Sequence, residues 1–584
     1  MYNNFTPMLP DNAHTRKIMK DIRKLAESDL DTDIKSLPYS KFKLFQEVGS
    51  RTEYENDYME HRRLLAIYGL MCLWEEDIRW MDKLCDVIWA ICDEYTWVLP
   101  AHLKGVTDIE LGKIKIDLFA AETSMYLSEL RYILGSRLPE RVSDRLEYEL
   151  DHRIIRPFLN GQNTWGVNNW SGVCGGAVGC TFIYMGRDKE FLQAKPYLLA
   201  CMKRFLDSYE EDGCCKEGAI YWNYGYSFFC FFAQLLYEYT RGEIDLFAEE
   251  KVKKIAYFGQ NTFLENDQVI SFSDAPHVLR YDCGLWNLLK QKYGDISLPD
   301  EQFESRFGDG FGDSNRRRLA PLLRNLYWYR EPEEKQGLQQ GKAIYYDQAE
   351  WYIHKKYTYK FAAKGGCNAE PHNHNDVGSF ELLADGKYIL DDVGWPEYTK
   401  DYFGEKRYEN LCASSLGHSV PIVCGMQQKA GKESKAQVLE VTDHTFMLEM
   451  SAAYPCEYLK YLTRRFELME EGIRLTDTVQ MENTADTDHS GNAFKEATTR
   501  NSYSFVERFV TRIKPEIRDE KVYIADYVLK CCNASAIDIR LDSFEFEPRF
   551  ESFKDDGHME TAYMIDFVCD GMEKAEFEIV KVRK

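Results

Sequence analysis

The hydrophobic period of this 584-residue chain changes once, near residue 330. Before that point apolar residues recur at three- and four-residue spacing, which is typical of helices that bury one face. After it apolar and polar residues alternate, which is typical of strands. A chain of this length also exceeds what one hydrophobic core usually organises. We therefore expect a helical domain over 1–329, a linker over 330–342 and a β domain over 343–584.

Several helical patterns follow one another in the first half, separated by short breaks. They cover 63–99, 114–134, 140–158, 188–209, 222–241 and 246–263. Many antiparallel helices with short connections predict an (α/α) toroid or a solenoid. In the second half, period-two runs such as 472–477 and 537–541 predict an antiparallel β-sandwich. The predicted fold class is a multidomain α+β chain, with an N-terminal toroid and a C-terminal sandwich.

Charge and composition narrow the classes of partner. The formal net charge of −23 argues against a nucleic acid, and an anionic substrate would need a local basic surface. The amino terminus shows no signal region, and no apolar run is long enough to cross a bilayer. The 17 cysteines are scattered and predict reduced thiols. We expect a cytoplasmic protein without membrane contact or organic cofactor. The sequence leaves open whether the protein forms a homo-oligomer.

Residues 371–395 hold two histidines ahead of a predicted hairpin. His372 and His374 are two residues apart, so both imidazoles face the same way in an extended backbone. The apolar runs on either side of Asp385-Gly386 predict a β-hairpin with a two-residue turn. Two imidazoles and the carboxylates that follow the hairpin therefore lie on one short β unit.

The hairpin ends in Asp391 and Asp392, and His418 follows in a short polar turn. Histidines and a carboxylate without thiolates suit Zn²⁺. In an ideal hairpin Asp391 lies about six residues, or ~20 Å of extended strand, from His374, so the backbone after His374 must bend back. The alternative is a loop of polar histidines satisfied by hydrogen bonds. If Asp392 is the ligand instead, the hairpin register differs by one residue.

Paired amides lie between two indoles at 163–170. Asn168 and Asn169 stand directly before Trp170 and a run of small residues. Neutral carboxamides can donate hydrogen bonds to a bound carboxylate without carrying charge. The competing interpretation, which these residues favour in isolation, is an asparagine turn or helix cap packed by tryptophan.

A tyrosine-rich segment spans residues 216–226. Tyr221 and Tyr224 are three residues apart and share a face if a helix has begun there. Glu217 precedes them and Trp222 lies between them. The competing interpretation is a helix start packed in the core, with Glu217 as an ordinary first-turn charge.

Together these blocks resemble the heparinase II/III-like polysaccharide lyases. The matching motifs are Asn168-Asn169-Trp170, Glu217-Gly218 through Tyr224-Gly225, His372-Asn373-His374-Asn375-Asp376 with Asp391, and Leu416-Gly417-His418-Ser419. Their order and spacing are hard to obtain by chance, and in architecture the resemblance covers nearly the whole chain. Members of this family have an N-terminal (α/α) toroid and a C-terminal antiparallel β-sandwich, so the resemblance implies both domains here.

The resemblance implies β-elimination at a uronic acid in an acidic poly- or oligosaccharide of the glycosaminoglycan or alginate type. The enzyme must neutralise the carboxylate, remove the C5 proton and protonate the departing O4, which leaves a 4,5-unsaturated end. By similarity Asn169, together with Asn168, would neutralise the carboxylate, because hydrogen bonds to it strengthen as it becomes an enediolate. Trp170, Glu217 and Trp222 would contact the sugar.

Three residues would complete the proton chemistry. The family's catalytic tyrosine falls at Tyr221, with Tyr224 an open alternative, and a phenol of pKa near ~10 needs cationic or metal help to act as a base. His372 resembles the family's second proton-transfer residue, and Tyr402 resembles a family active-site tyrosine. Several relatives place a histidine near the position of Asn169, and the neighbouring residues here include none.

The same resemblance implies a structural Zn²⁺ whose ligands map to His374, Asp391 and His418. The ion would brace the loop that carries His372 without polarising the substrate. The sequence does not reveal which uronic-acid polymer is cut or whether it is sulfated.

Two other classes compete with this interpretation. A glycoside hydrolase on an (α/α) toroid needs two carboxylates flanking the bond, and Glu217 and Asp274 are available although nothing in the sequence pairs them. A non-catalytic carbohydrate-binding protein would keep the tryptophans without the tyrosine and histidine, and this chain has all of these. Fold alone does not decide among the three.

Overall fold

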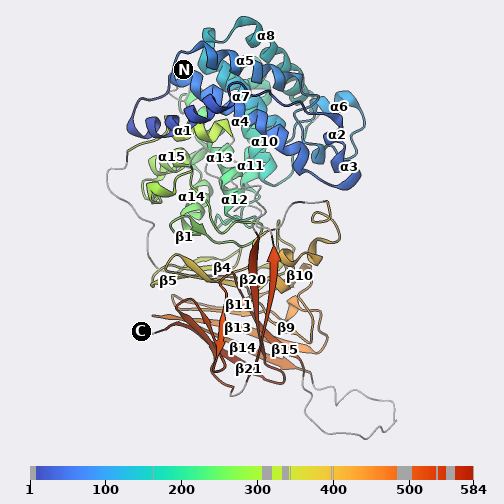
Figure 1. Ribbon diagram of the computed structural model, residues 1–584, viewed down its shortest axis with the longest axis vertical. Helices are drawn as coiled ribbons and strands as arrows, with labels where there is room; N and C mark the ends of the chain where they lie inside the picture. The colour runs from blue at the N-terminus through green and yellow to red at the C-terminus, as the bar shows by residue number, and fades with distance from the viewer. Residues whose placement is uncertain are drawn as a thin grey trace.

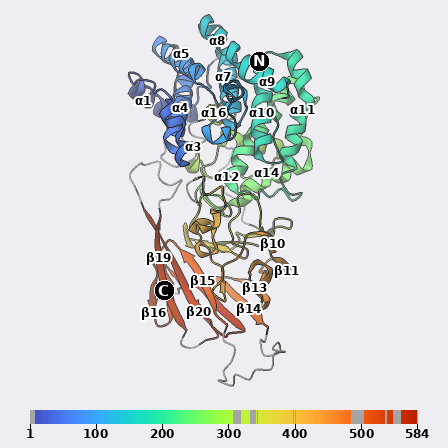
Figure 2. The same cartoon turned by 90° about the vertical axis from the view of Figure 1, so that its right-hand side faces the viewer.

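The computed structural model describes residues 8–161, 163–305, 318–331, 341, 343–395, 398, 400–482, 503–534, 537–546 and 559–582. Figure 1 shows helices at one end of the long axis and sheets at the other, and the view at right angles in Figure 2 shows the same division. The expected helical toroid and antiparallel β domain are both present. Most of the expected linker over 330–342 lies outside the described residues.

The helical domain has two layers. Helix α10 packs against α7 and α13, α4 packs against α7, and α16 returns to both α4 and α7, while α1, α5, α8, α11 and α15 pack outside them. The α-helices are α1 (Ala13–Asp29), α2 (Tyr39–Phe42), α3 (Leu44–Val48), α4 (Thr52–Trp74), α5 (Ile78–Asp93), α6 (Ile109–Ile114), α7 (Leu118–Leu134), α8 (Glu140–Leu150), α9 (Arg156–Leu159), α10 (Asn169–Tyr184), α11 (Asp188–Leu206), α12 (Ala219–Tyr221), α13 (Ser227–Tyr239), α14 (Glu250–Thr262), α15 (Cys283–Tyr293) and α16 (Leu319–Tyr327). Across the described residues, none of these helices has the length and apolar character needed to cross a bilayer.

Glycines allow the close packing of α10, which is buried along nearly its whole length. A Cβ atom at Gly176 would lie 2.6 Å from the carbonyl oxygen of Phe228 in α13. One at Gly172 would lie 2.5 Å from the ring of Phe205 in α11. Such approaches leave no room for a side chain. The glycine-rich run therefore fixes α10 between α11 and α13, and with it the place of Asn169 at the helix amino terminus.

The β domain is built from antiparallel sheets. The five-stranded sheet has the order β3 (Ile344–Tyr346), β4 (Trp351–His354), β5 (Tyr359–Lys364), β7 (Phe380–Ala384) and β8 (Lys387–Leu390). The eight-stranded sheet has the order β11 (Gln437–Val441), β12 (Thr445–Glu449), β13 (Leu459–Met469), β14 (Gly472–Met481), β21 (Lys574–Lys581), β18 (Tyr527–Cys531), β17 (Lys521–Ile524) and β16 (Glu516–Arg518). The four-stranded sheet has the order β19 (Asp538–Phe546), β20 (Glu560–Val568), β15 (Phe505–Thr511) and β9 (Ile422–Val423). Two small pairs join β6 (Cys367–Asn368) to β10 (Gly431–Lys435), and β1 (Phe263–Glu265) to β2 (Gln268–Val269) in the helical domain.

The five-stranded sheet is buried on both faces, because it lies between the two domains. Tyr352 and Phe361 belong to the core of the sandwich, whereas Trp351 and Leu383 belong to the core of the helical domain. The Trp351 ring lies 5.1 Å from that of Phe272 in the helical domain. Strands covered on both faces read as continuous apolar runs. This sheet therefore joins the two domains and holds the loops between them.

Lys355, directly after β4, strengthens this junction. Its Nζ donates to the carbonyl oxygens of Gln260, at 2.9 Å, and Phe263, at 2.5 Å, where α14 ends. Burial lowers the pKa of Lys355 to about 7. A buried lysine of the β domain thus satisfies carbonyl groups at a helix terminus of the other domain.

Candidate functional site

The candidate site lies where the helical domain meets the β domain. The helical domain contributes the segment 216–226 and the turn 271–277, which pack together. Ser273 Oγ donates to the carbonyl oxygen of Lys216 at 2.7 Å. Gly218 has φ +100°, and a Cβ atom there would lie 3.0 Å from Ala275 Cβ. The turn that carries Asp274 is therefore fixed against the segment that carries the tyrosines.

Asp274 is the centre of the site and receives hydrogen bonds from the β domain. Its Oδ2 accepts from His372 Nδ1 at 2.7 Å and from Tyr398 Oη at 2.8 Å. Its Oδ1 accepts from His374 Nε2 at 3.1 Å and from Tyr402 Oη. Both carboxylate oxygens are occupied, so Asp274 orients other side chains and has little capacity left for a ligand.

The charge of Asp274 is stabilised by its donors. Burial alone would raise the pKa of Asp274, but hydrogen bonds from His372 and His374 outweigh it and hold that pKa well below its usual range. Arg407 Nη2 lies 3.5 Å from Oδ2, and its guanidinium lies 4.1 Å from the centre of the Tyr402 ring. Asp274 is therefore a buried, ionised carboxylate that fixes the imidazoles and phenols around it.

Tyr221, the last residue of α12, contacts this cluster from the helical side. Its ring centroid lies 4.3 Å from that of His372, and its Oη lies 2.6 Å from Tyr398 Oη. Because Tyr398 donates to Asp274, its hydroxyl oxygen is able to accept from Tyr221. A chain of hydrogen bonds thus runs from Tyr221 through Tyr398 to Asp274.

His372 is held in an unusual backbone conformation. Its φ is +57°, in the left-handed region that few residues other than glycine adopt. Such strain persists where the surroundings over-determine it, often at functional sites. Because Nδ1 donates to Asp274, Nε2 carries the lone pair and is able to accept a proton.

The two tyrosines that the sequence left as alternatives lie in different surroundings. Tyr224 Oη donates to Glu122 in α7, inside the helical domain. A π-helical turn over Trp222–Tyr226 begins directly after Tyr221 and contains Tyr224, so the helical phase changes between the two residues. Of the pair, Tyr221 is the one whose ring lies against His372.

Trp222 is too deeply buried for the sugar-binding role that we expected, whereas Glu217 is partly exposed. Trp222 is 1% exposed and donates from Nε1 to the carbonyl oxygen of Ile255 at 2.7 Å. Burial of this kind excludes contact with a sugar, so Trp222 is a core residue, contrary to our expectation. Burial also raises the pKa of Glu217, an effect that His372 opposes.

The amide pair starts helix α10. Asn168 Oδ1 accepts from the backbone N–H of Trp170 at 3.1 Å, so Asn168 is the helix cap that the competing interpretation described. Asn169 is the first helical residue and is partly buried. A Cβ atom at Gly225 would lie 3.2 Å from Asn169 Cβ, so the helix start lies against the tyrosine segment.

A histidine from a distant part of the chain contacts Trp170, the residue that follows the amide pair. The imidazole of His102 lies 4.8 Å from the Trp170 ring, edge to face. Its Nδ1 donates to Asp117 Oδ2 at 2.7 Å. The sequence around Asn169 gave no sign of this residue, because it lies more than 60 positions earlier in the chain.

His374, Asp392 and His418 form a buried group whose donor atoms all lie within 4.8 Å of one another. His374 Nε2 donates to Asp274, and His418 Nε2 donates to the carbonyl oxygen of Cys412 at 2.9 Å. Both Nδ1 atoms therefore carry lone pairs. Within the described residues, neither of these buried Nδ1 atoms has a hydrogen-bond partner. Two neutral imidazoles and a carboxylate at this spacing fit a divalent cation.

Asp392 takes the place that we expected for Asp391, and a bulge is the reason. β7 pairs with β8 through Ala384 and Lys387, but Leu382 lies opposite Leu390, so β8 contains one extra residue. The extra residue shifts the following carboxylates by one position.

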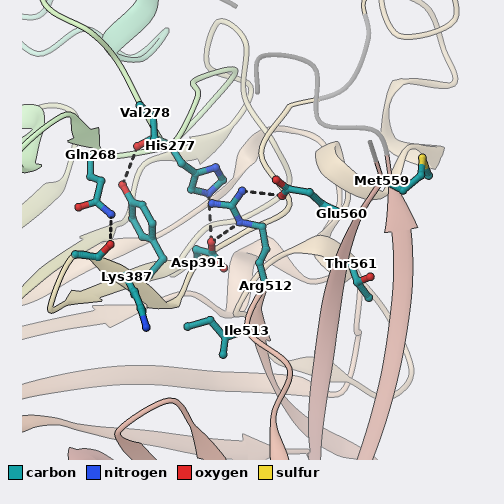
Figure 3. A pocket seen from close by; sticks show the side chains of 12 residues that line it. Gln268, His277, Val278, Lys387, Asp391, Arg512, Ile513, Met559, Glu560 and Thr561 are labelled. Carbon is teal, nitrogen blue, oxygen red and sulfur yellow. Dashed lines mark hydrogen bonds and ion pairs between the residues drawn. The ribbon is translucent and has the colours of Figure 1, made fainter. Parts of the chain in front are cut away.

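Asp391 itself faces a different part of the molecule. Its Oδ2 accepts from Arg512 Nε at 2.8 Å, and Arg512 Nη1 also contacts Glu560 at 3.1 Å. Figure 3 shows these side chains with His277 on the wall of a cavity of about 460 Å³. Asp391 is paired with Arg512, so the carboxylate that lies with His374 and His418 is that of Asp392.

Comparisons with known proteins agree with this architecture. No family model and no curated protein matches the sequence. A heparinase III structure aligns with 100% of this chain and 87% of its own, at TM-score 0.62 and 13% identity. A heparan sulfate lyase from Pedobacter heparinus aligns over 100% and 86%, at TM-score 0.59 and 11% identity. A chondroitin AC lyase from Streptomyces coelicolor A3, in complex with chondroitin sulphate, aligns over 98% and 79%, at TM-score 0.58 and 7% identity. The chain therefore has the two-domain fold of these polysaccharide lyases.

Proposed function

We propose that this chain is a polysaccharide lyase of the heparinase II/III-like type. It would cut poly- or oligosaccharides that contain uronic acid by β-elimination and leave a 4,5-unsaturated uronate. The observation that carries the proposal is the contact between Tyr221 and His372 at the domain junction, with both side chains linked to Asp274. The fold shared with heparan sulfate and chondroitin AC lyases supports the class.

Asn169 would neutralise the substrate carboxylate. Its carboxamide stands on the first turn of α10, where the positive end of the helix dipole also favours an anion. Hydrogen bonds from such a site strengthen as the carboxylate becomes an enediolate, which lowers the barrier to losing the C5 proton. Asn168, as the cap, would hold this helix start in place.

Tyr221 and His372 would move the protons. One of the two removes the C5 proton, and a phenol or imidazolium then protonates the departing O4; the epimer at C5 decides the assignment. Each proton transfer of this kind contributes ~10²–10⁴-fold to a rate. Tyr398 and Tyr402, which both donate to Asp274, would position the pair.

The histidine group would hold a structural metal ion, and Zn²⁺ suits the donors. We assign His374, Asp392 and His418 as its ligands, with Asp392 in place of Asp391. The ion would supply a rigid cross-link beneath the loop that carries His372. Asp274 orients His374 through Nε2, as carboxylates commonly do for metal-bound histidines.

A glycoside hydrolase fits the site less well. Such an enzyme needs two carboxyl groups that face the bond, about 5–9.5 Å apart. Both oxygens of Asp274 already accept hydrogen bonds, and Glu217 is only partly exposed. Neither carboxyl group is placed to serve as the acid and base of a hydrolysis.

The test is a panel of uronic-acid polysaccharides and their short oligosaccharides, incubated with the wild-type protein in ¹⁸O-labelled water. A lyase product absorbs in the ultraviolet through its new double bond and takes up no label. A hydrolase product carries one label and no double bond. Unsaturated, unlabelled product from one member of the panel is the expected result, and labelled product would overturn the proposal.

The variant His372→Ala accompanies the panel, with His444→Ala as the matched control. His444 is a partly exposed histidine of the β domain that contacts Tyr357. We expect His372→Ala to lose elimination by ~10²-fold or more, and His444→Ala to keep it. Equal activity of the two variants would remove His372 from the mechanism.

A further inference from the structure

A second group of metal-binding side chains lies in the helical domain, away from the site described above. His14 comes from α1, Cys283 is the first residue of α15, and Glu304 follows a short 3-10 turn. All three are buried, and their donor atoms lie within 4.8 Å of one another. His14 thus lies beside Cys283 and Glu304 in the interior, although these residues are far apart in the sequence.

The spacing of these atoms is close to that of a zinc coordination shell, with the sulfur slightly farther from the imidazole. Zinc bonds of about 2.0–2.3 Å in a tetrahedron place neighbouring donor atoms about 3.3–3.6 Å apart. His14 Nε2 lies 3.4 Å from Glu304 Oε1 and 3.8 Å from Cys283 Sγ. The separation of His14 and Glu304 exceeds the ~2.7–2.9 Å of a charge-assisted hydrogen bond between nitrogen and oxygen.

Other histidine–carboxylate pairs of this chain give the comparison. His61 with Glu94 and His102 with Asp117 are each 2.7 Å apart, as direct hydrogen bonds require. His418 Nδ1 and Asp392 Oδ2, in the other histidine group, are 3.6 Å apart. His14 and Glu304 are thus farther apart than these direct hydrogen bonds, as His277 and Asp391 are at 3.5 Å outside either group.

A fourth possible donor atom, a backbone carbonyl oxygen, lies beside the group. The carbonyl oxygen of Asn325 lies 3.1 Å from His14 Nε2 and 3.5 Å from Cys283 Sγ. Its position is fixed, because the Asn325 side chain accepts from Gly284 N at 2.8 Å and donates to Asp282 at 3.2 Å. One thiol, one imidazole, one carboxylate oxygen and one carbonyl oxygen therefore lie close together.

We propose that His14, Cys283 and Glu304 bind a second, structural divalent cation of the zinc class, with the Asn325 carbonyl beside them. The ion would fasten α1 to α15 and α16. Without the ion, hydrogen bonds would join the same atoms, and His14 and the Cys283 thiol would donate to oxygen. Burial raises the pKa of the Cys283 thiol, so metal binding would have to release its proton.

The position of this group connects it to the tyrosine segment. Asp282, which accepts from Asn325, also accepts from Asn223 Nδ2 at 3.2 Å. Asn223 lies in the π-helical turn directly after Tyr221. A cation at His14 and Cys283 would therefore make the residues that support the tyrosine segment, Asp282 and Asn325, more rigid.

The test uses Co²⁺ as the probe on the full-length protein freed of metal with a chelator. Cobalt bound to a thiolate gives an intense charge-transfer absorption, and the ligands of the group at His374, Asp392 and His418 include no thiolate. We expect this absorption in the wild-type protein and in His418→Ala. We expect its loss in Cys283→Ala, with one bound metal fewer per chain.

The matched control is Cys230→Ala, which removes another fully buried thiol, in α13. It should keep both the absorption and the metal content of the wild type. Absence of the thiolate absorption from cobalt-loaded wild type would overturn the proposal, whether or not the variants fold. An unchanged absorption in Cys283→Ala would overturn it as well. Neither result depends on lyase activity, so the two proposals are tested separately.

Discussion

Asp274 is the residue on which the candidate site depends most. It accepts hydrogen bonds from two histidines and two tyrosines, and Arg407 lies beside it. Its two oxygens orient different side chains. Oδ2 orients His372, and Oδ1 orients His374, which belongs to the group formed with Asp392 and His418. One carboxylate thus couples the proposed proton-transfer residue to the proposed metal ligands.

Replacing Asp274 with Asn tests this coupling. A carboxamide keeps the shape but offers one acceptor atom, so some of the four donors lose their partner. We expect metal affinity to fall ~10–100-fold, as for other partners of metal-bound histidines. Elimination should fall by a similar factor or more, because His372 would no longer be held in position.

Metal titration and kcat measurements on Asp274→Asn provide the check. Asp542→Asn, an exposed position on β19, is the control and should match the wild type in both. If Asp274→Asn binds metal and turns over substrate normally, the carboxylate is not the organiser of the site.

The site residues differ in how far the sequence could predict them. Asn169, Tyr221 and His372 stand in short local motifs, so the sequence could point to them. Asp274 pairs with His372 across 98 positions of the chain, and nothing local marks that pairing. Tyr398 contacts the site through the same tertiary packing and was missed for the same reason.

Helix α10 shows how one element positions a functional group. Its glycines lie against the Phe205 ring of α11 and the Phe228 carbonyl of α13, and the helix start lies against the tyrosine segment. The sequence revealed the small-residue run but not which neighbours it met. The β7–β8 hairpin shows the opposite case: its turn was predicted, but one bulged residue exchanged the roles of Asp391 and Asp392.

Gly176→Ala tests the packing of α10. The new Cβ would meet the Phe228 carbonyl oxygen at 2.6 Å, and a backbone atom inside a helix cannot move away easily. We expect a loss of about 1–3 kcal/mol in the free energy of unfolding. Gly166→Ala, whose Cβ would meet its nearest atom at 3.8 Å, is the control for chemical denaturation. Equal stability of the two variants would contradict this account of α10.

Because Lys355 is buried at the junction between the domains, we expect the free energy of unfolding to depend on pH. Its pKa is about 7 in the folded protein and about 10.4 in an unfolded chain, so the unfolded state binds more protons between these values. Stability therefore rises with pH across that window, by up to about 5 kcal/mol from this group. Lys355→Met lacks this contribution.

The difference in unfolding free energy between wild type and Lys355→Met should increase from about pH 7 to about pH 10. Lys356→Met, at the exposed neighbouring position, should run parallel to the wild type. A constant difference between wild type and Lys355→Met would show that this lysine keeps its charge when buried.

At the scale of the whole molecule, the function depends on two domains that meet over one sheet. The change of hydrophobic period predicted both domains, because helices and strands leave different patterns in the sequence. The way the five-stranded sheet lies between the two cores was not predictable, since that depends on which side chains pack against which domain. Tyr221 and His372 come from opposite sides of that junction and form a site only in the assembled molecule.

The most direct test of this account compares Tyr221→Phe with Tyr224→Phe on the substrate identified from the panel. Each variant removes one hydroxyl group and keeps the ring. We predict that Tyr221→Phe loses ~10²–10⁴-fold in kcat, with an unchanged melting temperature, and that Tyr224→Phe keeps elimination while losing stability, because its hydroxyl group contacts Glu122 in the interior. Elimination by Tyr221→Phe at the wild-type rate would contradict the central claim.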